Sequence, residues 1–139
     1  MLLKDAVVLL VSRREHSIFE LRQKLRKHSD SSTDIDAAIE WAVEQDLVDE
    51  SRFAESRVMH RWNRGYGPLK VISELRIHQM PAKLIDKTVD LYDWQEALSK
   101  SCHKCRYDIG SDAWKRVMIS RGFSYDDVTT WLHRHTEGV

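Results

Sequence analysis

The chain carries, near its middle, the stretch LVDESRFA (residues 47–54), followed by GYGP (65–68) and ISEL (72–75). Asp49 is a preferred residue type for the N-cap of a helix. Gly65 and Gly67 are typical of a tight turn, and Pro68 suits the first position of a helix that begins after the turn. The stretch therefore predicts a helix end, a helix start, a turn and a second helix start within one unit.

The composition around this stretch favours an all-α protein. The 139 residues include only two prolines and five glycines, and charged residues make up 32% of the chain. Alternating β-branched residues are scarce, which argues against strands. A unit of about 45 residues would bury too little surface to be stable alone, whereas three stacked units could share apolar contacts.

The apolar pattern repeats along the chain. A shift of fifty positions places Leu25 on Leu75 and Ile35 on Ile85, and a further shift of forty-three places Leu75 on Met118. We predict three tandem three-helix repeats, at residues 1–48, 49–92 and 93–139, stacked as one continuous domain into an elongated array, straight or curved. A single chain of this kind is expected to be a monomer.

Helix starts are expected at several polar residues and prolines. Ser17 and Glu20 have the spacing of a capping box, as do Asp93 and Glu96. Pro81, like Pro68, is expected at the first position of a helix.

Charge is segregated along the chain although the net charge is zero. Residues 1–28 carry seven basic and three acidic side chains, residues 29–50 carry eight acidic and no basic ones, and residues 51–78 carry six basic and two acidic ones. The segments 79–93, 94–121 and 122–139 alternate more weakly in the same sense. The pattern predicts two basic helices and an acidic third helix in each unit, and hence a basic and an acidic side of the array.

Basic residues at helical spacing form two candidate ridges. Arg57, Arg61 and Arg64 recur at i, i+4 and i+7, and Arg22 and Arg26 recur at i and i+4. These faces are either ordinary solvated surface or a surface for a charged partner. The residues expected to bind a partner are Arg22, Arg26, Arg57, Arg61, Arg64, Tyr66, Lys70 and Arg76.

Tyr66 stands between two glycines, next to the end of the arginine ridge. It is either packed over the turn or an exposed aromatic that anchors a protein contact or stacks on a base.

Targeting signals and membrane spans are not expected. The apolar run at residues 6–11 is short and basic residues follow it, so it is read as the first core helix. No run approaches the roughly 20 apolar residues that cross a membrane. Two cysteines cannot form a disulfide framework, which favours a reducing, cytoplasmic setting.

No catalytic, cofactor or metal site is expected. Cys102 and Cys105 could share one face of a helix, but zinc needs further ligands, so we interpret them as small apolar residues. None of the seven histidines has a nucleophile and an acidic partner in a recognisable pattern. Gly65 and Gly67 do not form a phosphate-binding fingerprint. The chain is predicted not to be an enzyme.

The central stretch resembles the RecX family of bacterial recombinase regulators. REHS (14–17) with ELRQKL (20–25) is similar to the opening motif of that family, and RGFSY (121–125) to its closing motif. The residues that match the central motif are expected to be mainly structural, and they are Asp49, Arg52, Phe53, Gly65, Gly67 and Pro68.

The resemblance implies a function. It implies tandem three-helix units that bind the RecA recombinase filament on single-stranded DNA and inhibit its ATPase and strand-exchange activities. The chain would then be a negative regulator of homologous recombination and of the DNA-damage (SOS) response. The alternative is a nucleic-acid-binding module that resembles a helix-turn-helix domain and acts on DNA directly, with phosphates bound by the basic helices.

Overall fold

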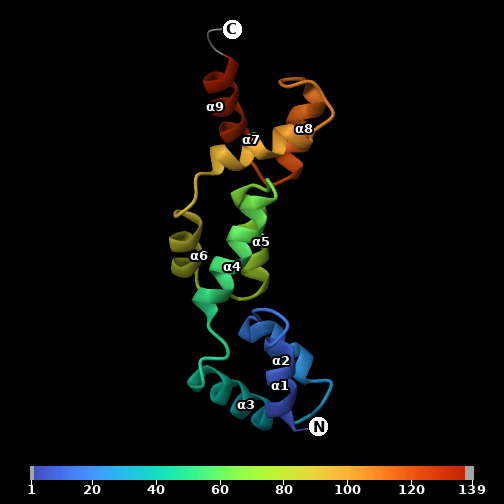
Figure 1. Ribbon diagram of the computed structural model, residues 1–139, viewed down its shortest axis with the longest axis vertical. Helices are drawn as coiled ribbons and strands as arrows, with labels where there is room; N and C mark the ends of the chain where they lie inside the picture. The colour runs from blue at the N-terminus through green and yellow to red at the C-terminus, as the bar shows by residue number, and fades with distance from the viewer. Residues whose placement is uncertain (1, 137–139) are drawn as a thin grey trace.

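The computed structural model describes residues 2–136, and these residues form α-helices and no β-strand (Figure 1). The prediction of an all-α fold is confirmed. The helices are α1 (Leu3–Val11), α2 (Ile18–Leu25), α3 (Ser32–Glu44), α4 (Glu50–Asn63), α5 (Pro68–Ile77), α6 (Ala82–Val89), α7 (Trp94–Lys104), α8 (Asp112–Ser120) and α9 (Tyr125–Thr136).

The helices form an elongated array of three groups. Figure 1 shows α1–α3 at one end, α4–α6 in the centre and α7–α9 at the other end. Each group has its own cluster of buried apolar side chains. The half-buried Trp94 packs against both the second and the third cluster. The tandem-repeat architecture is therefore confirmed, and the unit boundaries after residues 48 and 92 stay predictions.

Helix starts follow the local sequence closely. The Asp49 side chain accepts a hydrogen bond from the Arg52 backbone N–H at 2.9 Å and so caps α4. Ser17 and Glu20 form the capping box of α2, and Pro68 is the first residue of α5. The expected position of Pro81 is wrong by one residue, because Pro81 is the N-cap of α6 in an extended conformation.

Residues at the start of α4 connect the first unit to the second. Glu50 accepts a hydrogen bond from the backbone N–H of Ile18 at 2.8 Å, so the second unit caps the first turn of α2. Arg52 donates from Nε to Glu15 at 2.7 Å and from Nη2 to the carbonyl oxygen of Asp46 at 3.1 Å. The motif that begins the second unit therefore also makes hydrogen bonds to the first unit.

The same junction contains a buried polar contact. The hydroxyl of Ser17, which is fully buried, lies 2.6 Å from His78 Nδ1. Burial lowers the pKa of His78 and favours the neutral ring, and the tautomer of that ring sets which of the two groups donates in this hydrogen bond. The rings of Phe53 and Phe19 lie against the same imidazole, with centroids 4.7 and 6.2 Å away.

The GYGP turn connects the second unit to the third. Gly67 donates its backbone N–H to the carbonyl oxygen of Arg121 at 2.8 Å, and Leu69 donates to that of Gly122 at 3.0 Å. A Cβ atom on Gly67 would lie 2.3 Å from the backbone of Gly122. Gly65 has φ +79° and leaves no room for a side chain, because its Cβ would lie 2.9 Å from Ser101 N. The two glycines thus allow two backbones to touch.

Candidate partner-binding surface

The cationic ridge of α4, defined here as Arg57, Arg61 and Arg64, runs along one face of the helix and ends at its C-cap. Arg61 binds Glu74 of α5 with Nη2 at 2.7 Å and Nε at 3.2 Å. Arg57 Nε lies 4.0 Å from the same carboxylate. In residues 2–136, Arg64 takes part in no ion pair. Glu74 therefore neutralises one charge of a ridge that carries three.

Tyr66 and Lys70 extend the cationic ridge to the start of α5. The ring of Tyr66 lies beneath two cations, with Arg61 Cζ 5.4 Å and Lys70 Nζ 4.7 Å from its centroid. The side chain is half-buried, so it is packed over the turn and holds the cations together. A nucleobase could not stack on the covered face of the Tyr66 ring unless the cation over that face moved away.

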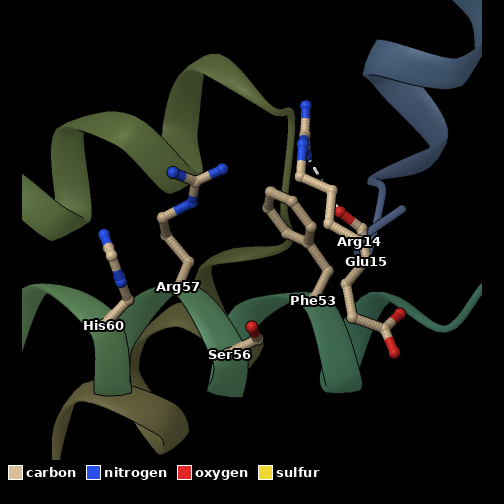
Figure 2. A pocket seen from close by; sticks show the side chains of 6 residues that line it. All are labelled: Arg14, Glu15, Phe53, Ser56, Arg57 and His60. Carbon is tan, nitrogen blue, oxygen red and sulfur yellow. Dashed lines mark hydrogen bonds between the residues drawn. The ribbon is translucent and has the colours of Figure 1, made fainter. Parts of the chain in front are cut away.

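A pocket of about 210 Å³ lies at the other end of the cationic ridge (Figure 2). In Figure 2, Phe53, Ser56, Arg57 and His60 rise from α4, and Arg14 and Glu15 come from the loop before α2. The guanidinium of Arg57 packs over the ring of Phe53, with Cζ 5.4 Å from the centroid. The first unit thus adds one cation and one carboxylate to the surface of the second.

Glu20 fixes the position of Arg14. Both carboxylate oxygens of Glu20 accept hydrogen bonds from Arg14 at 2.8 Å, and Oε1 also accepts the Ser17 N–H at 3.2 Å. Burial alone would raise the pKa of Glu20, but these hydrogen bonds outweigh it and lower the pKa to about 2. The pair is ionised at neutral pH and keeps the Arg14 segment against α2.

His16 lies behind this pair and is only 2% exposed. Its Nδ1 is 2.9 Å from the carbonyl oxygen of Arg14, which can only accept, so Nδ1 carries the proton. Its Nε2 accepts a hydrogen bond from Lys24 Nζ at 2.9 Å. Burial lowers the pKa of both His16 and Lys24, which agrees with a neutral ring beside a cation.

Three of the predicted binding residues are not joined to the cationic ridge. Arg22 pairs with Asp36 of α3 at 3.2 Å. Arg26 is exposed, and its side chain makes no ion pair or hydrogen bond within residues 2–136. Arg76 is also exposed, but it is six residues beyond Lys70 and so lies about 240° around α5 from it. The sequence analysis missed Arg14, because an arginine in a loop has no helical period.

The acidic side of the array is confined mainly to the first unit. Helix α3 exposes four carboxylates and no cation, namely Asp34, Asp36, Glu40 and Glu44. The prediction of an acidic third helix is wrong for α6, which carries Lys83, Lys87 and only one carboxylate, Asp86. The other acidic residues of that segment lie in the flanking turns, so the described residues 2–136 form no acidic strip along the length of the array.

Other kinds of site find little support in the described residues. Between residues 2 and 136 no three histidine, cysteine or acidic side chains gather closely enough to hold a metal ion. Cys102 and Cys105 are half-buried thiols packed against the third apolar cluster, and burial raises the pKa of Cys102. None of the described helices combines the length and apolar character needed to cross a membrane.

Comparison with known proteins places the chain among related sequences. The family model described as RecX, second three-helix domain, matches residues 49–89. Regulatory protein RecX of Ralstonia pickettii (strain 12J) is 33% identical over 129 residues, which are 88% of this chain and 80% of that protein. This chain belongs to the RecX family. A second RecX relative, from Halorhodospira halophila, is 33% identical over 134 residues, 90% of this chain and 83% of that protein.

Solved RecX structures share the fold. The crystal structure of RecX from Lactobacillus salivarius superposes with a TM-score of 0.75 and 21% identity, over 95% of this chain and 93% of that one. A second crystal structure of regulatory protein RecX gives a TM-score of 0.74 at 15% identity, over 93% of this chain and 69% of that one. The relatives are named regulatory proteins, and the fold of this chain is that of the RecX family.

Proposed function

We propose that the chain binds the RecA filament on single-stranded DNA and inhibits ATP hydrolysis and strand exchange by that filament. It would thereby repress homologous recombination and the DNA-damage response. Membership of the RecX family supports this proposal, because its members are named regulatory proteins. The elongated array supports it too, since stacked units present one long surface that can contact neighbouring subunits of a filament.

The cationic ridge is the observation that carries the proposal. Arg57, Arg61 and Arg64 share one face of α4, and Arg61 and Lys70 lie over the ring of Tyr66. Of these four cations, only Arg57 and Arg61 have an ion-pairing carboxylate within residues 2–136, and it is Glu74 for both. An excess of positive charge on one face favours a negatively charged partner and speeds its encounter. A nucleoprotein filament offers both acidic side chains and phosphates.

The test is RecA ATP hydrolysis on excess single-stranded DNA while the chain is titrated in below the recombinase concentration. Inhibition by the wild-type chain supports the proposal, and its absence refutes it. Neutralising the cationic ridge should raise the half-inhibitory concentration about tenfold. The ridge variant is Arg57→Gln, Arg61→Gln and Arg64→Gln combined.

A control variant removes the same number of charges elsewhere on the surface, through Lys83→Gln, Lys87→Gln and Arg116→Gln, all exposed and outside the ridge. Circular dichroism must show that both triple variants are folded. Equal inhibition by the ridge variant and the control would refute the assignment of the ridge while leaving the regulatory function in place. Inhibition by the control should match the wild type.

A further inference from the structure

A second basic cavity lies where the second unit meets the third. Its volume is about 320 Å³, and its lining residues are Arg64, Tyr66, Lys104 and Arg121. Arg64 is the C-cap of α4, Lys104 the last residue of α7, and Arg121 the C-cap of α8. Three cations from three helices therefore converge on one cavity, and the described residues add one phenol and no carboxylate to its lining.

The hydrogen bonds of these cations are to neutral groups. Lys104 Nζ donates to the carbonyl oxygen of Arg64 at 3.1 Å. Arg121 Nη1 donates to the carbonyl oxygen of Ser101 at 3.0 Å and to its hydroxyl at 2.6 Å. All ion pairs found between residues 2 and 136 lie in the first two units, at residues 14–74, and none includes Arg64, Lys104 or Arg121.

A helix-capping role accounts for part of this charge but not for all of it. Each helix C-terminus carries the equivalent of about −0.5 elementary charge, so three converging C-termini offset about half of the three positive charges. The cavity keeps an excess of about +1.5. That excess matches one phosphodiester, which carries a single negative charge, and falls short of the charge of a nucleoside triphosphate.

The surroundings of the cavity indicate a polymer. The cavity is open to solvent and continues into the cationic ridge, since Arg64 belongs to both. The pocket at Arg57 lies seven residues earlier on α4, which corresponds to about 10 Å along the helix. A chain of phosphates could occupy both places, whereas a small anion would fill one.

We infer that the cavity between Arg64, Lys104 and Arg121 binds a backbone phosphate of single-stranded polynucleotide. This inference rests on the proposed function for the identity of the polymer, and it assigns a role to Lys104 and Arg121, which have no place in the cationic ridge. Tyr66 also lines the cavity, with Arg61 of α4 and Lys70 of α5 over its ring.

The experiment measures binding of a fluorescein-labelled deoxythymidylate oligomer by anisotropy between about 50 and 200 mM salt. The double variant Arg64→Gln/Lys104→Gln removes two cavity cations and leaves Arg121, which holds α8 against α7 through Ser101. The control, Lys83→Gln/Lys87→Gln, makes the same change in net charge on exposed positions of α6.

Each lost cation should weaken binding up to about fivefold at low salt, because the sites are exposed. The slope of log affinity against log salt should become shallower by about 0.7 for each cation, and hence by about 1.4 for the double variant. A cavity variant that binds like the control overturns the inference and leaves helix capping as the role of the cations. Absence of oligomer binding by the wild-type chain overturns it too.

Competition with ATP and with inorganic phosphate identifies the source of the anion. The inference requires both to displace the oligomer much less effectively than unlabelled oligomer does. If ATP displaced the labelled oligomer at concentrations equal to those of unlabelled oligomer, the inference of a polymeric ligand would be overturned and the cavity would be assigned to a free nucleotide. Inhibition of the RecA ATPase, measured with the same variants, tests the proposed function separately. If the wild-type chain did not inhibit the RecA ATPase, the result of the oligomer-binding experiment would still stand.

Discussion

The junction between the second and third units can be tested by adding one methyl group. Gly67 has φ −90° and ψ 168°, a conformation that alanine adopts without strain. The added Cβ of Gly67→Ala would nevertheless lie 2.3 Å from the carbonyl carbon and oxygen of Gly122 and 2.6 Å from Phe123 N. Backbone atoms cannot rotate away as a side chain does, so the two units must separate.

The magnitude follows from the contacts that would be lost. Separation breaks the hydrogen bonds from Gly67 N–H to Arg121 at 2.8 Å and from Leu69 N–H to Gly122 at 3.0 Å. Each contributes about 1 kcal/mol net, and overpacking adds about 1–3 kcal/mol. We expect a loss of about 3–5 kcal/mol in the free energy of unfolding of the third unit. With a urea m-value of about 1–3 kcal/mol/M, the midpoint should fall by about 1 M or more.

Tryptophan fluorescence during urea unfolding is the assay, because four of the five tryptophans lie in or against the third apolar cluster. The matched control is Gly110→Ala, a glycine of the third unit at φ +87° whose Cβ would meet only the Leu132 side chain at 3.7 Å. It should cost about 1–2 kcal/mol from the backbone conformation alone. A Gly67→Ala variant as stable as Gly110→Ala or the wild type would refute the close-approach argument.

Three further predictions concern the first junction. Phe53→Ala should destabilise the chain by about 3–5 kcal/mol in chemical denaturation, because the ring is 2% exposed and packs on His78. Phe53→Leu should lower the stability clearly less. Equal losses of stability in the two variants would contradict the role of ring packing. In a double-mutant cycle, Arg52→Gln and Glu15→Gln should show a coupling energy below about 1 kcal/mol that shrinks with added salt, since both side chains are about one-third exposed. A larger coupling energy that does not change with salt would contradict a solvent-screened ion pair. Stability measured by urea unfolding should fall between pH 4.5 and 2, because the pKa of Glu20 is lowered from 4.5 to about 2 and the carboxylate stabilises the fold only while ionised. Glu20→Gln should flatten that part of the pH profile. An unchanged profile in this variant would exclude Glu20 as the cause of the fall.

The local elements of the fold were predictable from short stretches of sequence. The cap at Asp49, the capping box at Ser17 and the start of α5 at Pro68 depend on residues within four positions of one another. Pro81 was placed one residue wrong, because a proline without its own N–H fits both the N-cap and the first turn. The prediction that α6 is acidic is wrong because a charge count over a segment cannot separate the residues of a helix from those of its flanking turns.

The candidate site was predictable only in part. The spacing of Arg57, Arg61 and Arg64 gave the cationic ridge, because residues on one helix share a face at fixed intervals. The partners of that ridge come from other helices. Glu74 lies on α5, and Arg14 comes from the loop before α2. No spacing in the sequence connects an arginine in a loop to pocket residues that lie 39 to 46 positions later.

The sequence by itself determined the helical class of this chain, its tandem units and its resemblance to the RecX family, because these depend on hydrophobic period, caps and motif residues that act locally. Only the tertiary structure decided what the motif residues do between units. It places Glu50 on the start of α2 and Gly67 against Gly122, and it brings Lys104 and Arg121 to Arg64. These contacts join residues 32 to 57 positions apart, and their geometry arises only when the units pack against one another.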